Sequence, residues 1–394
     1  YSIGGSQTDI EADHRKNWSV SSNDTISFSP TFVGTLGIGF TRTALHGQGN
    51  GVGRNPADLK VPSIIISNQA SPGWPNFRFS GLTMPEIGGR FRDQMNNVYS
   101  VMTTFNKLAG AHNFRFGLDW RTVRWNENNP DVQAEGVFTS SDKLTMKNPD
   151  SADGSGAAIA SFLLGLPTSG TMARRTSLAL QTHYAGIFAQ DDWKISKKLT
   201  ASFGLRWEME TPFTDRYNKL AYGFDETGDV GVTVPGLAPL KGGMTFVNAN
   251  GLPRRQGAVD WNNFGPRLGF AYALNSKTVL RGGYGIFYES YSVSGIAGNP
   301  STVASFNATT NYASSTNSDR TVLPGISLAN PFPDGLVQPT GSSLGLKTEL
   351  GNSISIPYQA RVLPYTQQWQ LSFQRELPWQ LLLEVAYVGT HALK

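Results

Sequence analysis

Hydrophobic and polar residues alternate from Tyr184 to Glu208, which predicts two strands joined by a short polar turn. In the second arm, the odd positions from Leu199 to Trp207 are apolar, and the even positions are small, polar or charged. Because side chains alternate across a strand, one face of this arm is apolar and the other polar. In the first arm the pattern is weaker, and its apolar face is expected to carry Leu178, Leu180, Tyr184 and Phe188.

The same alternation recurs in other parts of the chain: residues 26–41, 98–125, 267–289 and 367–387. Residues 26–41 predict one long strand with a bend at Pro30. At Val123 and Trp125 the alternation changes phase, which predicts a bulge or the end of the apolar band. Together these patterns predict about nine strands, most of roughly 9–13 residues.

The connections between these strands are unequal in length. Within each hairpin they are short, and between hairpins they are long and rich in Gly, Asn, Ser, Thr and Pro: residues 44–96, 126–176, 209–262 and 290–364. Structureless loops of that length are uncommon in compact soluble domains. Short turns at one end and long loops at the other are typical of transmembrane β-barrels. We therefore expect an all-β, antiparallel, up-and-down transmembrane barrel, of which residues 1–394 form a part with long extracellular loops.

Composition supports this expectation. Charged residues make up 16% of the 394 residues, below the roughly 25% of soluble domains, and the chain has 43 glycines and 11% aromatic residues. A net charge of +4 is too small to indicate a nucleic-acid partner. No apolar run approaches the roughly 20 residues of a membrane helix. The longest, residues 157–166, predicts a short helix with Ser155 as a candidate N-cap.

No catalytic or metal-binding motif is complete. The glycines at 282–285 lack the Lys and Ser/Thr of a phosphate loop, and no Gly-x-Ser-x-Gly elbow occurs. The five histidines are scattered, the chain has no cysteine, and Asp191–Asp192 fit solvated residues beside a turn better than a catalytic pair. Residues 225–229 loosely resemble a calcium loop without its closing Glu, so loop calcium stays open. We expect no enzyme, cofactor or resident metal.

Two sets of residues are candidates for roles in the barrel. Charged residues in phase with the polar face are expected to point into the lumen, where they form structural salt bridges or contact a solute: Arg115, Asp119, Arg121, Arg206, Glu208, Arg267, Arg281 and Glu289. On the lipid face, such charges would cost about 2–4 kcal/mol at mid-membrane. Aromatic residues near strand ends are candidates for the interfacial girdle: Trp125, Trp207, Tyr288 and Tyr387.

Six stretches, in this order, resemble the barrel of TonB-dependent outer-membrane receptors: HNFRFGLDW (112–120), ASFLLGLP (160–167), YAGIFAQDDWKISKKLTASFGLRWE (184–208), NNFGPRLGFAYAL (262–274), TVLRGGYGIFYE (278–289) and VAYVGTHALK (385–394). The closest similarity is to the Oar-like branch, abundant in acidobacteria. The resemblance implies a bacterial outer-membrane barrel of 22 strands, preceded by a carboxypeptidase-like sandwich and a plug domain. Its implied partners are outer-membrane lipid, the plug, the energising protein TonB and an unknown solute.

Neither a plug-like segment nor a TonB box is visible in these residues. The chain opens without Met or a signal peptide and ends at Lys394 inside a predicted strand, which predicts a fragment of a longer protein. Four alternatives stay open: a surface adhesion protein anchored by the same barrel, a passive porin, a secreted carbohydrate-active β-protein, and a soluble β-sandwich or propeller. The identity of the solute cannot be read from the sequence.

Overall fold

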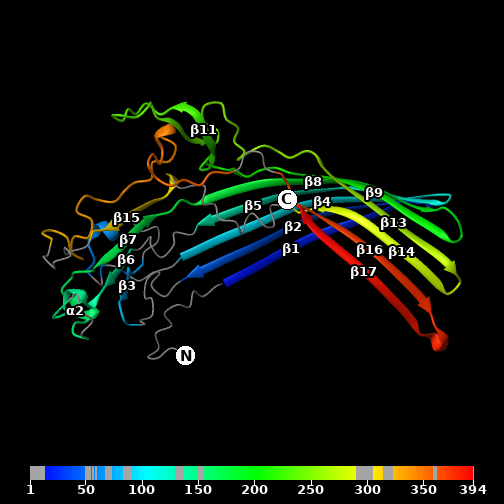
Figure 1. The fold of residues 1–394 in the computed structure, drawn as a ribbon, viewed down its shortest axis with the longest axis horizontal. Coiled ribbons are helices and arrows are strands. Elements are labelled where there is room, and N and C mark those ends of the chain that lie inside the picture. Colours follow the sequence, from blue (N-terminus) through cyan, green and yellow to red (C-terminus); the bar gives the residue numbers. More distant parts are fainter. Residues whose placement is uncertain are drawn as a thin grey trace.

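A single curved antiparallel sheet dominates the computed structural model (Figure 1). The structure describes residues 14–48, 55, 57, 60–66, 73–82, 91–128, 136–148, 154–289, 305–313, 323–357 and 362–393. Its main sheet follows the order β1-β2-β4-β5-β8-β9-β13-β14-β16-β17, and the short β10 pairs with β8 at the side. The strands of this sheet are β1 (His14–Ser29), β2 (Phe32–Gln48), β4 (Phe91–Ala109), β5 (His112–Asn128), β8 (Leu178–Lys194), β9 (Leu199–Glu210), β10 (Thr214–Asp215), β13 (Asn263–Asn275), β14 (Thr278–Tyr288), β16 (Tyr365–Glu376) and β17 (Leu382–Leu393). The predicted all-β antiparallel architecture is confirmed.

The first hairpin corrects one prediction. Residues 26–41 are not one bent strand, because the chain reverses at Pro30 and Thr31 between β1 and β2. Proline has a fixed φ and no backbone N–H, so it suits a turn better than a strand interior. The rings of Phe28 and Phe32 stack across this turn, with centroids 4.9 Å apart. The main sheet therefore has one more long strand than the alternation predicted.

The change of phase at Val123 and Trp125 is not a bulge. The pairing of β5 with β4 and β8 continues through both residues without a register shift. Val123 is buried, and Trp125 packs beside Leu178 and Leu180 in a cluster completed by Leu220 and Val247. Apolar residues therefore appear on the polar face where the sheet extends beyond the apolar band and is covered by a long connection.

The long connections are folded rather than structureless. Three of them contribute to a four-stranded sheet in the order β15-β7-β6-β3, at the end of the main sheet opposite the short turns (Figure 1). A fourth forms the two-stranded sheet β11-β12. The elements of the long connections are α1 (Ser63–Ile66), β3 (Asn76–Phe79), β6 (Val137–Ser140), η4 (Asp142–Leu144), α2 (Ala158–Leu163), β7 (Ser169–Arg174), β11 (Ala221–Asp229), β12 (Lys241–Phe246), β15 (Ala308–Tyr312) and η6 (Gly345–Lys347); η7 (Pro378–Gln380) lies in the last short turn.

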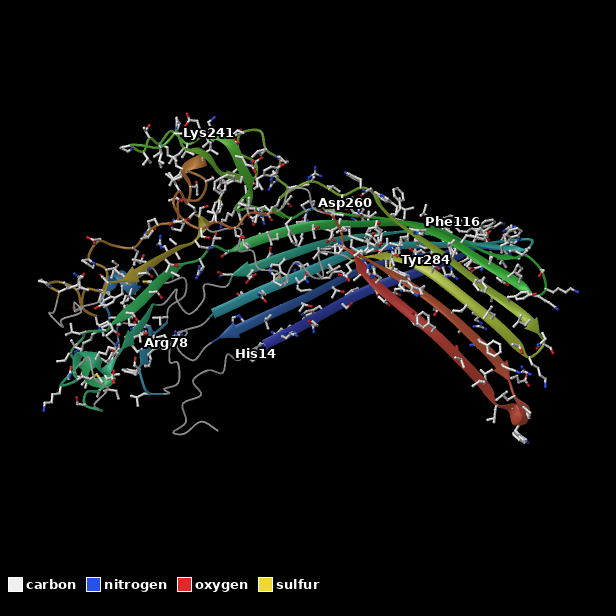
Figure 2. All side chains as sticks on the ribbon, viewed as in Figure 1. His14, Arg78, Phe116, Lys241, Asp260 and Tyr284 are labelled. Carbon is white, nitrogen blue, oxygen red and sulfur yellow. The ribbon has the colours of Figure 1, made fainter. Side chains whose placement is uncertain are left out.

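Hydrophobic cores hold these connections together. One core contains Ile65, Phe138, Met172, Tyr312 and Phe332, which come from three different connections. Burying each of these side chains stabilises the fold by about 1.5–3 kcal/mol. Residues far apart in the sequence are therefore packed into one body beside the sheet. Figure 2 shows Arg78 and Lys241 within these connections, away from the strands that carry Phe116 and Tyr284.

The short helix predicted in residues 157–166 is present as α2 (Ala158–Leu163). Its N-cap residue is Ala157, which makes no side-chain capping bond. Ser155 does not cap the helix, because its hydroxyl accepts a hydrogen bond from the Lys147 amide at 2.9 Å. In the part of the chain that the structure describes, no helix is long and apolar enough to span a bilayer.

Pairing registers divide the side chains of the main sheet between two faces. The apolar face carries exposed large side chains on successive strands, including Ile38 at 53%, Ile187 at 53% and Leu268 at 51%. On β2, nine residues from Phe32 to Phe40 belong to this band; they span about 30 Å of strand, or about 23 Å when tilted by 40°. That height matches the roughly 25 Å apolar band of outer-membrane barrels.

The face assigned to the first arm of the central hairpin is wrong. Tyr184 and Phe188 pair with Arg121 and Gly117, so they lie on the polar face. The apolar face of β8 instead carries Ala185, Ile187 and Ala189, paired with Trp120, Leu118 and Phe116. The alternation misplaced Tyr184 because its ring is apolar, whereas its hydroxyl hydrogen-bonds to charged side chains on the polar face.

Candidate functional site

A connected group of charged residues lies on the polar face where β5, β8 and β9 meet. We call it the ionic network and define it as Asp119, Arg121, Tyr184, Arg206 and Glu208. Arg121 donates two hydrogen bonds to the Asp119 carboxylate, from Nε at 3.0 Å and Nη2 at 2.8 Å. Asp119 is only 5% exposed. A buried carboxylate requires partners of this kind, and the bidentate geometry supplies both charge and direction.

Arg206 joins the two halves of the ionic network. Its Nη2 donates to the Tyr184 hydroxyl at 2.7 Å and lies 3.4 Å from Asp119 Oδ2, while its Nε donates to Glu208 Oε1 at 2.8 Å. Tyr184 donates its hydroxyl proton to the same Glu208 oxygen. Two arginines thus meet two carboxylates, and the network is neutral within itself.

Gly186 makes room for the ionic network. It pairs with Asp119 on one side and Glu208 on the other, at the centre of the group. A Cβ atom added at Gly186 would lie 2.7 Å from Arg206 Nη2 and 2.9 Å from the Tyr184 hydroxyl. The space above this glycine is therefore filled by charged and polar side chains from neighbouring strands.

The remaining charged candidates share this face without joining the network. Arg115 donates from Nε to Asn106 Oδ1 at 3.2 Å. Arg267 lies over the Phe287 ring at 4.8 Å, and its Nε is buried without a hydrogen-bond partner among the described residues. Arg281 pairs in register with Ala271 and is exposed. Glu289 follows the last residue of β14 and is also exposed.

Between Arg267 and Arg281 the polar face is nearly bare. Gly269 pairs with Gly283 across β13 and β14, one step from each arginine. An added Cβ would find its nearest neighbour at 3.5 Å for Gly269 and 3.6 Å for Gly283, which are ordinary contacts. We call these two glycines and the two arginines the open surface. Space above this part of the wall is left unfilled by the wall itself.

The four aromatic girdle candidates do not share one surface. Trp207 lies on the apolar face near the end of β9, stacked on Trp261 with centroids 6.1 Å apart. Tyr288 ends β14 and its ring lies 5.6 Å from that of Tyr365. Tyr387 is on the apolar face but in the middle of β17, paired with Leu371. Trp125 lies on the polar face, where it donates to Glu127 Oε2 at 3.0 Å.

The acidic residues that could have held calcium or acted as a catalytic pair are engaged in local hydrogen bonds. Among the described residues, no group of three or more His, Asp or Glu side chains is arranged to hold a metal ion. Asp225 accepts hydrogen bonds from the Thr227 amide and hydroxyl and from the Gly228 amide, at 2.9–3.0 Å. Asp191 and Asp192 point to opposite faces: Asp191 pairs with His112 at 2.7 Å, and Asp192 accepts from Ser202 at 2.6 Å. Neither pattern supports calcium binding or acid–base catalysis.

A hollow of about 460 Å³ lies against the apolar face rather than the polar one. Phe116, Ile187, Leu205 and Trp207 contribute to its lining, and polar atoms contribute little of it. Phe116, which Figure 2 labels on the sheet, marks its position. Its chemistry suits hydrocarbon, so it offers no site for a polar solute.

Sequence alternation missed one polar group on the apolar face. Arg42, Asn97, Arg124 and Gln181 pair side by side across β2, β4, β5 and β8. We call these four residues the cationic row. Each residue sits singly in its own strand, so only the inter-strand register brings them together.

Comparisons with known proteins agree with this architecture. A profile of the family described as an outer membrane beta barrel domain matches residues 3–394. No curated protein matches the chain. The ferric-catecholate import receptor Fiu of E. coli K12, closed form, is similar over 98% of this chain and 42% of its own, at 11% identity and a TM-score of 0.44.

Two further solved structures are similar. The ferric yersiniabactin uptake receptor FyuA of Yersinia pestis aligns over 96% of this chain and 36% of its own, at 10% identity and a TM-score of 0.43. The outer membrane transporter YddB of Escherichia coli aligns over 96% and 34%, at 8% identity and a TM-score of 0.48. The chain spans less than half the length of each of these three proteins. Since the family profile covers nearly every residue, the protein belongs to the outer membrane β-barrel family, and its place is the bacterial outer membrane.

Proposed function

We propose that this chain forms part of the wall of a TonB-dependent receptor that actively takes up a scarce solute across the outer membrane. The proposal rests on one observation: the two ends of the sheet differ in their connections, and its two faces differ in polarity. Short turns lie at one end, folded connections at the other, and a charged face lies opposite an apolar one. The ordered resemblance of six sequence stretches to such receptors supports it.

In this proposal the polar face lines the lumen. The ionic network, Arg115, Arg267 and Arg281 would then point away from lipid, where a charge at mid-membrane costs about 2–4 kcal/mol. Exposure along β13 agrees with it: alternate residues of the polar face from Asn263 to Ala273 are buried or half-buried, whereas Phe264, Leu268 and Phe270 on the other face are 50%, 51% and 40% exposed. Side chains converge on the inner face of a curved sheet and diverge on the outer one.

The two outermost strands of the sheet, β1 and β17, each have one edge without a pairing strand among the described residues. β1 pairs only with β2, and β17 pairs only with β16, among the described strands. An unpaired strand edge in hydrocarbon leaves N–H and C=O groups without partners, at several kcal/mol each. We propose that further strands of the same protein close the barrel. In the intact receptor a plug would block the lumen, and TonB would move it.

In this proposal, transport depends on binding of the solute and on movement of the plug, and it involves no covalent chemistry. The folded connections would meet the solute first, and the lumen face would meet it after the plug moves. The test compares cells with and without TonB for removal of solutes from a defined medium, measured by mass spectrometry of the medium. A solute that is depleted only when both TonB and this protein are present supports the proposal.

A surface adhesion protein is the second candidate, because the long connections form a folded body at one end of the sheet. Binding of cells to a surface that needs this protein but not TonB, with no TonB-dependent depletion, would favour adhesion. Stable conductance in planar bilayers without TonB would instead favour a passive porin. Either result would contradict gated uptake.

A further inference from the structure

The cationic row crosses the apolar face at its long-connection end. Arg42 donates from Nε to Asn97 Oδ1 at 2.8 Å, and Arg124 donates from Nε to Gln181 Oε1 at 2.9 Å. Asn97 is 5% exposed and lies between the two arginines. The arginines are two strands apart, or about 10 Å. Their side chains are therefore held in place by neighbours on adjacent strands rather than left free in solvent.

Each of the two guanidinium groups lies over an aromatic ring in a cation–π contact. Arg42 lies over the Phe40 ring at 5.7 Å, and Arg124 lies over the Tyr99 ring at 5.4 Å. Each such contact attracts the guanidinium to the face of the ring and so restrains its position. Among the described residues, no acidic side chain pairs with either arginine. With Nε already used, the Nη groups of both arginines are the donors that remain for a ligand.

The order of residues along the apolar face is that of a membrane interface. Ile38, Val101 and Trp120 pair side by side in the apolar band. The next step carries Phe40, Tyr99 and Thr122, and the step beyond it is the cationic row. Aromatic rings gather at the level of lipid headgroups, and cations lie where the phosphates are. The nearest acid on this face, Asp93, is two further steps away and pairs with His46 at 2.8 Å.

We propose that Arg42 and Arg124 bind the phosphate of an anionic lipid headgroup in the outer leaflet. A guanidinium presents two parallel N–H donors that match phosphate geometry, which a lysine ammonium does not. The long connections of outer-membrane barrels are extracellular, so this end of the face meets the outer leaflet. The inference rests on the lipid-facing surface of the barrel and holds whichever solute the protein takes up.

The test uses the intact protein, purified and reconstituted in phosphatidylcholine bilayers with a trace of spin-labelled phosphatidic acid. Electron spin resonance then measures how strongly the labelled lipid prefers the protein over bulk bilayer. The wild type is expected to show a clear preference that weakens in high salt. Losing one arginine, as R42Q or R124Q, is expected to lower the preference about fivefold. The double variant R42K/R124K, which keeps the charge but loses the fork, is expected to retain part of it.

Arg115→Gln is the matched control. Arg115 lies on the same strand as Arg124 and donates to an asparagine on β4, as Arg42 does, but it is on the opposite face. The preference should not change in this variant. The proposal is overturned if R42Q and R124Q match the wild type or if R115Q lowers the preference equally. If R42Q or R124Q does not fold, the double variant R42K/R124K tests the proposal instead. A lipid preference equal to that of the wild type in R42K/R124K would contradict recognition of the phosphate by the paired N–H donors of the guanidinium groups.

Discussion

The ionic network and the open surface occupy the same face of the same sheet, yet they are built in opposite ways. In the network, Arg206 contacts three partners and fills the space above Gly186. In the open surface, Arg267 and Arg281 form no ion pair among the described residues, and Gly269 and Gly283 have room above them. The first region has satisfied its own charges. The second carries positive charge, and its glycines leave volume that the wall itself does not fill.

The largest difference in stability between the ionic network and the open surface is expected when the central carboxylate, Asp119, is removed. Asp119→Ala leaves Arg121 and Arg206 without the acid that they share, and we expect the free energy of unfolding to fall by about 3 kcal/mol. Urea unfolding in detergent, followed by tryptophan fluorescence, measures the change. Arg281→Ala on the open surface is the control, with an expected change within about 0.5 kcal/mol. Equal losses of unfolding free energy in Asp119→Ala and Arg281→Ala would contradict the difference between the ionic network and the open surface.

Glycine replacements test the difference in free volume. A Cβ at Gly186, at the centre of the ionic network, would lie 2.7 Å from Arg206 Nη2 and 2.9 Å from the Tyr184 hydroxyl, so Gly186→Ala should destabilise the fold by about 2 kcal/mol. Gly269→Ala should be neutral or slightly stabilising, because it restricts the unfolded chain without a clash. The same unfolding measurement compares them. A large loss in Gly269→Ala would mean that the surface is already filled.

Tyrosine hydroxyls provide a finer comparison. Tyr184→Phe removes the group that accepts from Arg206 and donates to Glu208, and should cost about 1 kcal/mol. Tyr284→Phe on the apolar face is the matched control, since its hydroxyl makes no hydrogen bond to a described residue. Its unfolding free energy should stay near that of the wild type. If both variants lose equally, the tyrosine contributes through its ring rather than through the network.

The smallest expected effect lies outside the sheet, in the β11-β12 connection. Hydrogen bonds from the Thr227 amide and hydroxyl and from the Gly228 amide hold the pKa of Asp225 below its usual range. Because the folded pKa is depressed, this stabilisation is present above the ordinary value of about 3.9 and is lost as the pH falls through the folded pKa. The protection of the Thr227 and Gly228 amides against hydrogen exchange, measured relative to the intrinsic rate at each pH, should therefore fall as the pH is lowered. Asp225→Asn should abolish that pH dependence, whereas Glu226→Gln should leave it.

Much of the sheet was predictable because period-two alternation is a local signal. It located the β9 and β13 faces correctly and placed Arg206, Glu208 and Arg267 on the polar face. It failed at Tyr184, where ring and hydroxyl favour different faces, and at Pro30, where a turn resembled a bend. It also failed at Trp125, because a long connection covers that end of the polar face and makes an apolar side chain favourable there.

The site was harder to predict than the strands. Asp119 and Arg206 are 87 positions apart in sequence and meet only through the pairing of β5, β8 and β9. Arg42 and Arg124 likewise share a row only through β4. A single sequence carries no signal for register between distant hairpins, so it predicts which face a residue occupies but not which residues become neighbours. The strands within the long connections were missed because they are short and irregular in pattern.

The four-stranded sheet formed by the long connections couples their movements. β3 pairs with β6, β6 with β7, and β7 with β15, so segments from three connections are hydrogen-bonded in series. Phe306, from the same connection as β15, also packs on cores formed by β8, β11 and β12. A force applied to any one connection is therefore transmitted to the others. Under load, this end of the protein therefore moves as one unit rather than as independent loops.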